Sequence, residues 1–427
     1  MASSDASTFP FTIKEHTIEA QHIREYPHAT KSANDALKLA VKQYTPKSNP
    51  IPQPGDVTII GAHGAAFPKE LYEPIWHEIY DGLSQQGIRI RSIWIADTAS
   101  QSASGELNRE MLGNDASWFD HARDLLYMIN QFKAEMPQPI VGIGHSLGAG
   151  QMTLLSLLHP RLLSSLILME PVMEKDVRMA KGPIFVKLSL GRKDTWPSRE
   201  QAATYFRKQY KKWDPRVVDL WLQHGLRDID DSSSSSSGEN SGVTLLTSRS
   251  QEVTVYLRPN FTGRKPLSPD SDVEHDATFH PDVIGPENAI APFYRLEPVL
   301  LWKMLKHIRP PVLYLFGERS PVSQPERQEE KIQRTGSGIS GSGGYKRGLV
   351  RGVSVPGAGH HLPFEEVSRV SQETVSWLKG EMERWKREEE RVRKGWQELS
   401  QEQRTSVSDE WYSHLKGGEH KKTTSKL

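Results

Sequence analysis

A glycine-flanked serine is the first feature of this sequence that suggests catalysis. It lies in the pentapeptide Gly144-His145-Ser146-Leu147-Gly148, between two apolar stretches. The pattern G-x-S-x-G at a strand-to-helix turn is typical of a nucleophile, because the sharp turn needs small neighbours and lifts the hydroxyl into the site. A serine can also cap a helix at this position. At a helix N-terminus, however, the dipole also favours a developing oxyanion, and we predict Ser146 as the nucleophile of an acyl-transfer reaction.

A general base is expected after the last strand, because the chain order of such sites is serine, acid, histidine. The segment Val355-Pro356-Gly357-Ala358-Gly359 leads into His360 and His361. We predict His360, which directly follows the glycine, as the base. His361 is the alternative, since sequence alone does not separate two neighbours.

The acid has two candidate positions. The segment Gly317-Glu318-Arg319-Ser320-Pro321 occupies the usual place, but Ser320 stands where an Asp is expected and cannot stabilise an imidazolium by charge. Glu170 ends the preceding apolar run Leu166-Ile167-Leu168-Met169. A carboxylate at a buried strand end is costly without a partner, and a catalytic histidine is such a partner. We predict Glu170 as the acid, with Glu318 as the alternative.

Two main-chain amides are expected to hold the oxyanion. The turn His63-Gly64-Ala65-Ala66 follows the first core strand, where such turns supply one donor. We predict the N–H groups of Ala65 and Leu147 as the two donors. The imidazole of His63 is expected to bond within its own loop and not to act as the base.

Alternating strands and helices would position these residues. Short apolar strands near residues 11–13 and 37–41 come first. Strands are then predicted at 56–64, 88–95, 139–144, 162–169, 310–317 and 350–355, and helices at 68–83, 118–136, 146–158 and 365–378. This alternation, with the serine motif at a strand end, predicts an α/β-hydrolase fold with a mostly parallel sheet flanked by helices and an inserted lid.

The alternation of predicted strands and helices, and its interruption, indicate where the domains begin and end. Residues 1–171 and 307–380 form the two parts of the core, and 172–306 an inserted lid with a disordered serine-rich loop near 230–242. Five lid aromatics are candidates either for lining an apolar pocket or for packing within the lid: Trp196, Trp213, Trp221, Phe293 and Tyr294. Arg and Lys residues of the lid are candidates for holding phosphates, but the sequence singles none out.

Composition narrows the class of protein. The chain has 427 residues, 36% of them apolar, and a formal net charge of +1, so no global field favours nucleic acid. It has no cysteine, which excludes disulfides and thiolate chemistry and fits a reducing compartment. No secretory signal and no apolar run long enough to span a membrane is evident. We expect neither a metal nor a cofactor.

The C-terminal region, residues 381–427, is predicted to be a charged helix followed by a tail. The helix is either a solvated element or a homodimer contact. The tail ends in Ser425-Lys426-Leu427, which is a peroxisomal address read by an import receptor. We therefore expect a peroxisomal protein.

Several strings resemble fungal peroxisomal α/β-hydrolases of secondary metabolism, a family that includes hydrolases of the mycophenolic acid pathway and of Alternaria toxin clusters. The strings are His22-Ile23-Arg24-Glu25-Tyr26-Pro27, Val41-Lys42-Gln43-Tyr44-Thr45-Pro46, Pro68-Lys69-Glu70-Leu71-Tyr72-Glu73, Arg91-Ser92-Ile93-Trp94-Ile95-Ala96-Asp97 and Leu112-Gly113-Asn114-Asp115. The resemblance is dense over residues 10–175 and returns at the final histidine loop and the terminal address. It implies a serine-dependent type I acyl-CoA thioesterase that uses Ser146, His360 and Glu170. A family member has Asp at the position of Glu170, so the longer side chain requires a different histidine placement.

Three functional hypotheses follow. The first is an acyl-CoA thioesterase acting on a secondary-metabolite CoA thioester, such as a toxin precursor. The second is a peroxisomal lipase or carboxylesterase. The third, motivated by Ser320, is a non-catalytic hydrolase-fold binding protein.

Overall fold

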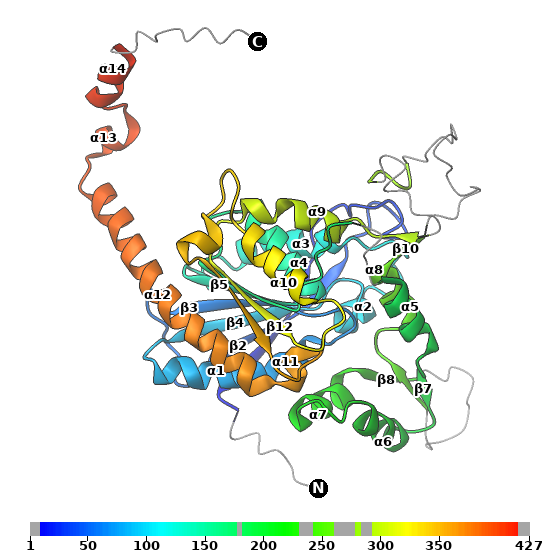
Figure 1. Cartoon of the computed structure of the whole chain (residues 1–427). Coiled ribbons are helices and arrows are strands. Elements are labelled where there is room, and N and C mark those ends of the chain that lie inside the picture. The colour runs from blue at the N-terminus through cyan, green and yellow to red at the C-terminus, as the bar shows by residue number, and fades with distance from the viewer. Residues whose placement is uncertain (1–8, 177–181, 230–241, 260–277, 283–292, 417–427) are drawn as a thin grey trace. The chain divides into compact units, whose positions relative to one another are not determined.

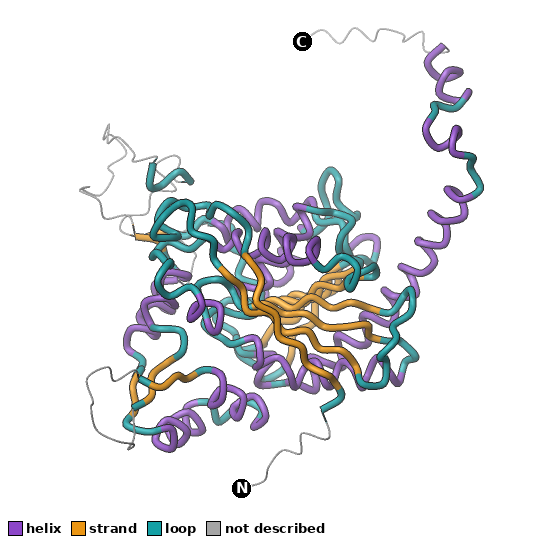
Figure 2. Tube along the Cα trace, turned by 180° about the vertical axis from the view of Figure 1, so that it is seen from behind, coloured by secondary structure: helices purple, strands orange, loops and turns teal. Residues whose placement is uncertain are grey.

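An eight-stranded sheet forms the centre of the protein (Figure 1, Figure 2). The computed structural model describes residues 9–176, 182–229, 242–259, 278–282 and 293–416. Strand β2 pairs antiparallel with β1 and β4, and the remaining pairs are parallel, so the predicted mostly parallel sheet is confirmed. In spatial order the strands are β1 (Phe11–Glu19), β2 (Lys38–Pro46), β4 (Ile90–Ala96), β3 (Val57–Ala62), β5 (Ile140–His145), β6 (Ser165–Met169), β12 (Val312–Gly317) and β13 (Val350–Val355).

The central strands owe their position to continuous apolar sequence. Every residue of β3, β5, β6 and β12 is buried, as parallel strands covered on both faces require. Apolar runs without alternation are therefore found at the centre of the sheet. The predicted site residues lie at or just beyond the carboxyl ends of these four strands, except His360 and His361, which follow β13.

Helices cover both faces of the sheet (Figure 1). One face is covered by α1 (Glu73–Gln85) and the part of α12 (Val367–Gln397) up to residue 381. The other is covered by α3 (Trp118–Gln131), α4 (Leu147–Leu158), α9 (Glu297–Met304) and α10 (Pro325–Arg334). Shorter elements are the 3-10 turns at Lys69–Tyr72, Leu305–His307 and Gly344–Arg347, with α2 (Ser102–Leu107) and α11 (Leu362–Glu365).

Several helix boundaries differ from the sequence-based expectation. The helix predicted at 68–83 is a 3-10 turn at Lys69–Tyr72 followed by α1, which begins at Glu73 and ends at Gln85. Helix α3 ends at Gln131, five residues earlier than predicted. The helices predicted at 365–378 and 381–400 form one helix, α12, which begins at Val367 and ends at Gln397. Only Lys379 and Gly380 lie between the two predicted helices, and one glycine costs a helix only about 1 kcal/mol.

The segment between β6 and β12 contributes small elements of its own. In chain order they are α5 (Gly182–Gly191), β7 (Thr195–Trp196), α6 (Arg199–Gln209), α7 (Pro215–His224), β8 (Leu226–Asp228), β9 (Val243–Leu245), α8 (Arg249–Tyr256), β10 (Arg258–Pro259) and β11 (Phe293–Tyr294). The short strands form two small sheets, β7-β9-β8 and β10-β11. The serine run at 232–237 lies outside the described residues. That this segment acts as a lid stays a prediction.

The chain divides into two compact units between Glu381 and Met382. The second unit holds the end of α12, then α13 (Gln401–Thr405) and α14 (Asp409–Lys416). Within α12, Glu390 and Lys394 form an ion pair at 2.8 Å, as is common for opposite charges four residues apart in a helix. The residues of the predicted peroxisomal address lie beyond the described residues, and the homodimer contact stays a prediction. Among the described helices, none has the length and apolar composition needed to cross a bilayer.

Candidate active site

Ser146 lies in a strained turn between β5 and α4. Its backbone has φ +53° and ψ −111°, a conformation that residues with a side chain seldom adopt. The two glycines of the motif make the turn possible. A Cβ on Gly144 would lie 2.5 Å from the carbonyl oxygen of Gly148, and one on Gly148 would lie 2.2 Å from that of Ala62. Backbone thus passes too close to both positions for a side chain, and the turn needs the two small residues that the sequence suggested.

The predicted serine, histidine and carboxylate lie in one hydrogen-bonded chain. Ser146 Oγ is 2.9 Å from Nε2 of His360. The other ring nitrogen of His360, Nδ1, is 3.0 Å from Oε2 of Glu170. His360 belongs to the loop between β13 and α11, and Glu170 directly follows β6. The carboxyl ends of three parallel strands thus bring together residues that are up to 214 positions apart in sequence.

Glu170 is fully buried, and three donors satisfy its carboxylate. Besides the contact with His360, Oε1 accepts a 2.6 Å bond from the N–H of Gly317, and Oε2 accepts a bond from the hydroxyl of Ser320. Such bonds offset the cost of burying a charge. Ser320 was singled out for lacking a carboxylate. The structure shows what it does instead: it holds the carboxylate supplied by the neighbouring strand.

The two alternative residues lie outside this chain of bonds. Glu318 is exposed, and its Oε2 accepts a 2.8 Å bond from the N–H of Gly357. The ring of His361 packs edge-on against Phe67 and Trp213. Burial, and the neighbouring His360, lower the pKa of His361 to about 3, so its imidazole is neutral at physiological pH.

The predicted oxyanion residues border the same space as Ser146. Ala65 and Leu147 both line the cavity that contains Ser146 and His360, and Leu147 is the first residue of α4. The N–H of the next residue in the loop, Ala66, is already bonded to Oε1 of Gln101 at 2.9 Å. This bond fixes the loop directly after Ala65.

His63 has the structural role expected for it. Its Nδ1 donates to the carbonyl oxygen of Gly64 at 2.8 Å, and its Nε2 accepts from the N–H of Thr98 at 2.8 Å. Nδ1 therefore bonds within the loop of His63, as expected, whereas Nε2 bonds to the loop that follows β4. Burial lowers the pKa of the imidazole.

A buried hydrogen-bond network that the sequence did not suggest links the loops around Ser146. The hydroxyl of Tyr72 accepts from the N–H of Gly64 at 2.8 Å and donates to Nδ1 of His145 at 2.8 Å. Nε2 of His145 donates to the carbonyl oxygen of His360 at 3.0 Å. Burial lowers the pKa of His145 well below its usual value, so the ring is neutral. The network ties the Ala65 loop to the main chain of the histidine loop.

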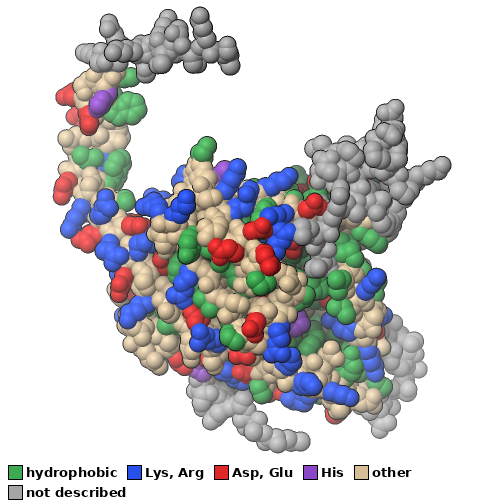
Figure 3. All heavy atoms as spheres, in the orientation of Figure 1, with side chains coloured by type: hydrophobic (Ala, Val, Ile, Leu, Met, Phe, Trp, Pro, Cys, Tyr) green, Lys and Arg blue, Asp and Glu red, His purple; other side chains and the backbone are tan. Residues whose placement is uncertain are grey.

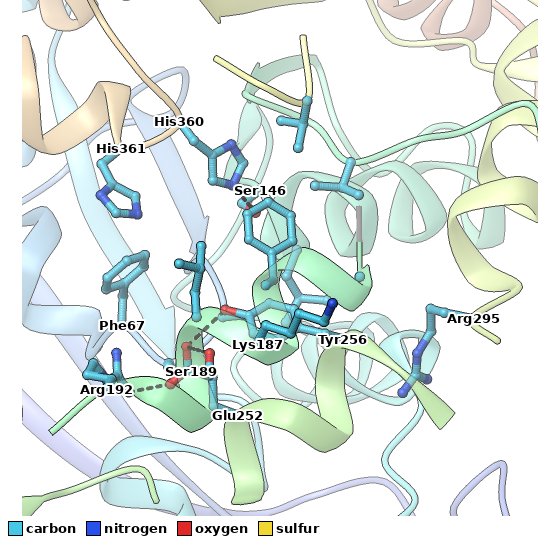
Figure 4. Close-up of a pocket in the computed structure, with 18 of the residues that line it drawn as sticks. Phe67, Ser146, Lys187, Ser189, Arg192, Glu252, Tyr256, Arg295, His360 and His361 are labelled. Atoms are coloured by element: carbon cyan, nitrogen blue, oxygen red, sulfur yellow. Dashed lines mark hydrogen bonds and ion pairs between the residues drawn. The ribbon is translucent and has the colours of Figure 1, made fainter. Parts of the chain in front are cut away.

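A cavity of about 560 Å³ opens beside Ser146 and His360 (Figure 4). Aromatic side chains form much of its wall, but they are not those suggested by the sequence. The aromatic lining residues, apart from the histidines, are Phe67, Trp118, Phe185, Tyr205, Tyr210 and Tyr256. The five suggested aromatics do not line it. Trp213, for example, stacks on Tyr210 with ring centroids 3.8 Å apart, behind the wall.

Part of the cavity wall is polar. Glu252 of α8 accepts a bond from the hydroxyl of Ser189 at 2.8 Å and from that of Tyr256 at 3.1 Å, and it is paired with Arg192 (Figure 4). These contacts join α5 to α8. The cavity therefore offers both apolar surface and buried polar groups to a ligand.

The fold and this serine-centred site define the class of protein. The family model of the alpha/beta hydrolase family matches residues 59–373, and the chain belongs to that family.

Named relatives extend over almost the whole chain. The sequence is 39% identical to type I acyl-CoA thioesterase mpaH' of Penicillium brevicompactum, over 96% of each chain. It is 38% identical to type I acyl-CoA thioesterase mpaH of Penicillium roqueforti, again over 96% of each chain. The abhydrolase domain-containing protein AFT2-1 of Alternaria alternata is 30% identical over 66% of this chain and 98% of its own. The family resemblance inferred from the sequence is thereby confirmed.

A solved structure supports the same fold. The peroxisomal alpha-beta-hydrolase Lpx1 of Saccharomyces cerevisiae superimposes with a TM-score of 0.62, over 86% of this chain and 90% of its own. At 18% sequence identity, this likeness speaks for the fold alone.

Proposed function

We propose that this protein is a serine-dependent acyl-CoA thioesterase, with Ser146 as nucleophile, His360 as general base and acid, and Glu170 as the carboxylate that orients His360. The observation that carries the proposal is the continuous chain from Ser146 Oγ through His360 to Glu170, with contacts of 2.9 and 3.0 Å. Nucleophile, base and orienting group at hydrogen-bond distances are what acyl transfer by a serine requires.

The reaction follows from this geometry. Ser146 Oγ attacks the thioester carbon while its proton passes to Nε2 of His360. The N–H groups of Ala65 and Leu147 hold the oxyanion, and removing one such donor typically costs two to three orders of magnitude in rate. Collapse of the tetrahedral intermediate breaks the C–S bond, and His360 protonates the leaving thiolate. Water then attacks the acyl-serine, gives its proton to His360, and the released serine oxygen takes that proton back.

Glu170 remains ionised throughout. Its contact with Nδ1 keeps that nitrogen protonated, so that Nε2 presents a lone pair to Ser146. The bonds from Gly317 and Ser320 hold the carboxylate in place.

The names of the relatives favour a CoA thioester as the substrate. Two relatives that match 96% of this chain are named type I acyl-CoA thioesterases. A cavity with both aromatic and polar walls suits an acyl group of some size, and a secondary metabolite is the acyl donor that we propose. The terminal Ser425-Lys426-Leu427 supports a peroxisomal location through the import receptor.

The test is a screen of the purified protein against acyl-CoA esters, with release of free thiol as the readout. We expect turnover by the wild-type protein, none by Ser146→Ala, and labelling by a fluorophosphonate probe that Ser146→Ala abolishes. Hydrolysis of simple esters without any thioester would reject the thioesterase and leave a serine esterase. Equal labelling of both proteins would reject Ser146 as the nucleophile.

A further inference from the structure

The surface around the cavity entrance carries an excess of positive charge. Residues 182–229, which include α5, α6 and α7, contain ten Lys and Arg against five Asp and Glu, whereas the whole chain has a net charge of only +1. In Figure 3, blue side chains lie over the part of the molecule that α6 and α7 form in Figure 1. This segment is therefore locally basic, although the chain as a whole is close to neutral.

Within this segment the arginines form ion pairs with described acidic residues, whereas the lysines do not. Five arginines are paired with acids: Arg192 with Glu252, Arg199 with Asp228, Arg207 with Asp219, Arg216 with Asp214 and Arg227 with Glu106. None of the five exposed lysines of the segment forms an ion pair with a described residue. Lys193 lies over the ring of Trp196, and the other four are Lys187, Lys208, Lys211 and Lys212. We call these four the entrance lysines.

One of the entrance lysines lines the cavity that holds Ser146, and the other three lie close in the chain to residues that line it. Lys187 is exposed and lines the cavity (Figure 4). Gln209 is also exposed and lines it, which places the last turn of α6 at the opening, and Tyr210 lines the wall behind it. Lys208 and Lys211 flank these two residues in the chain, and Lys212 follows.

When an acyl-CoA is bound with its thioester at Ser146, the phosphates of its coenzyme A part come to lie at this surface. The thioester carbon must reach Ser146 inside the cavity, so the pantetheine arm has to leave through the opening. The diphosphate and the 3′-phosphate then lie outside, in solvent. Lysine is a common phosphate ligand because its ammonium is a compact point charge with three donors.

We propose that the entrance lysines form the binding surface for the phosphates of coenzyme A, a proposal that rests on the proposed thioesterase activity. Because the four side chains are exposed, their attraction for phosphates acts through solvent and is screened by salt. The surface therefore selects acyl-CoA over uncharged thioesters chiefly at low ionic strength. Because Lys208, Lys211 and Lys212 are exposed and do not line the cavity, we expect substitutions there to leave the Ser146 site unaltered.

The experiment compares two thioesters of one acyl group, the CoA ester and the N-acetylcysteamine ester, which lacks the phosphates. The variant is Lys208→Glu/Lys211→Glu/Lys212→Glu. For acyl-CoA at low salt we expect KM to rise by about tenfold and the difference to shrink at high salt. Kinetics with the N-acetylcysteamine ester should match wild type, which also shows that the variant is folded. Adenosine 3′,5′-bisphosphate should inhibit the wild-type protein more strongly than the variant.

A control variant with the same change in net charge distinguishes an effect of the entrance lysines on KM from an effect of the total charge of the protein. Lys14→Glu/Lys133→Glu/Lys346→Glu changes the net charge equally at exposed positions outside the cavity lining, and its KM for acyl-CoA should stay at the wild-type value. An unchanged KM for acyl-CoA in the entrance variant would overturn the proposal, as would equal losses with both thioesters. Loss of binding to anionic vesicles with an unchanged KM would assign the lysines to a lipid surface instead. Failure of the wild-type protein to cleave either thioester would reject the thioesterase itself.

Discussion

Replacing Glu170 by Gln is the sharpest test of the proposed site. The side chain keeps its size, and the N–H of Gly317, 2.6 Å from Oε1, can bond only to the oxygen of the new amide. The amide NH2 group must then occupy the place of Oε2, facing Nδ1 of His360. Nδ1 would have to accept that bond, which moves the ring proton to Nε2, and Nε2 could no longer take the proton of Ser146.

We expect Glu170→Gln to lower kcat by a large factor. Trapping a catalytic histidine in the wrong tautomer by the corresponding substitution in a serine protease lowers kcat by about four orders of magnitude. Four orders correspond to about 5.5 kcal/mol of transition-state stabilisation. For Glu170→Gln we therefore expect kcat for the thioester to fall by roughly 10⁴, with a much smaller change in KM.

Glu318→Gln is the matched control. Glu318 is exposed and bonded to the N–H of Gly357, so its replacement should change kcat less than about threefold. Both proteins should be assayed with one acyl-CoA by thiol release, with thermal unfolding to establish that each is folded. A kcat for folded Glu170→Gln within tenfold of wild type, or a larger loss in Glu318→Gln, would refute the assignment of Glu170.

Three further predictions concern the surroundings of the site. Tyr72→Phe removes the bond to His145 and should lower kcat about tenfold with little change in KM; a change in KM alone would contradict a positioning role. Gly148→Ala would place a Cβ 2.2 Å from the carbonyl oxygen of Ala62, so inactive or poorly folded protein is expected from activity and circular dichroism. Burial keeps the pKa of His121 well below 6.5, and its ring nitrogens have no hydrogen-bond partner among the described residues. Because the unfolded chain takes up that proton and the folded one does not, stability falls as pH drops below 6.5. Between pH 7.5 and 5.5, denaturant titrations should show wild type losing about 1.4 kcal/mol more than His121→Leu, and equal losses would disprove this.

The sequence by itself determined the fold and the chemical type of the site. Continuous apolar runs predicted β3, β5, β6 and β12, because a strand covered on both faces needs apolar residues at every position. Gly144 and Gly148 marked the turn at Ser146, since only glycine fits their contacts with backbone. These signals are local, so they can be recognised without coordinates.

Only the tertiary structure decided which candidates meet. Glu170 and Glu318 both follow core strands, and His360 and His361 are neighbours, yet only Glu170 and His360 contact each other. Adjacent side chains in a turn point in different directions, and that direction is set by packing against residues far away in the chain.

The same reason explains the contacts that no pattern suggested. Ser320 and Glu170 are 150 positions apart, and Tyr72 and His145 are 73 positions apart. Tyr210 faces the cavity while Trp213, three residues later, lies behind it. Spacing along the chain carries no information about such pairs, because the sheet and its loops bring them together only when the whole domain has folded.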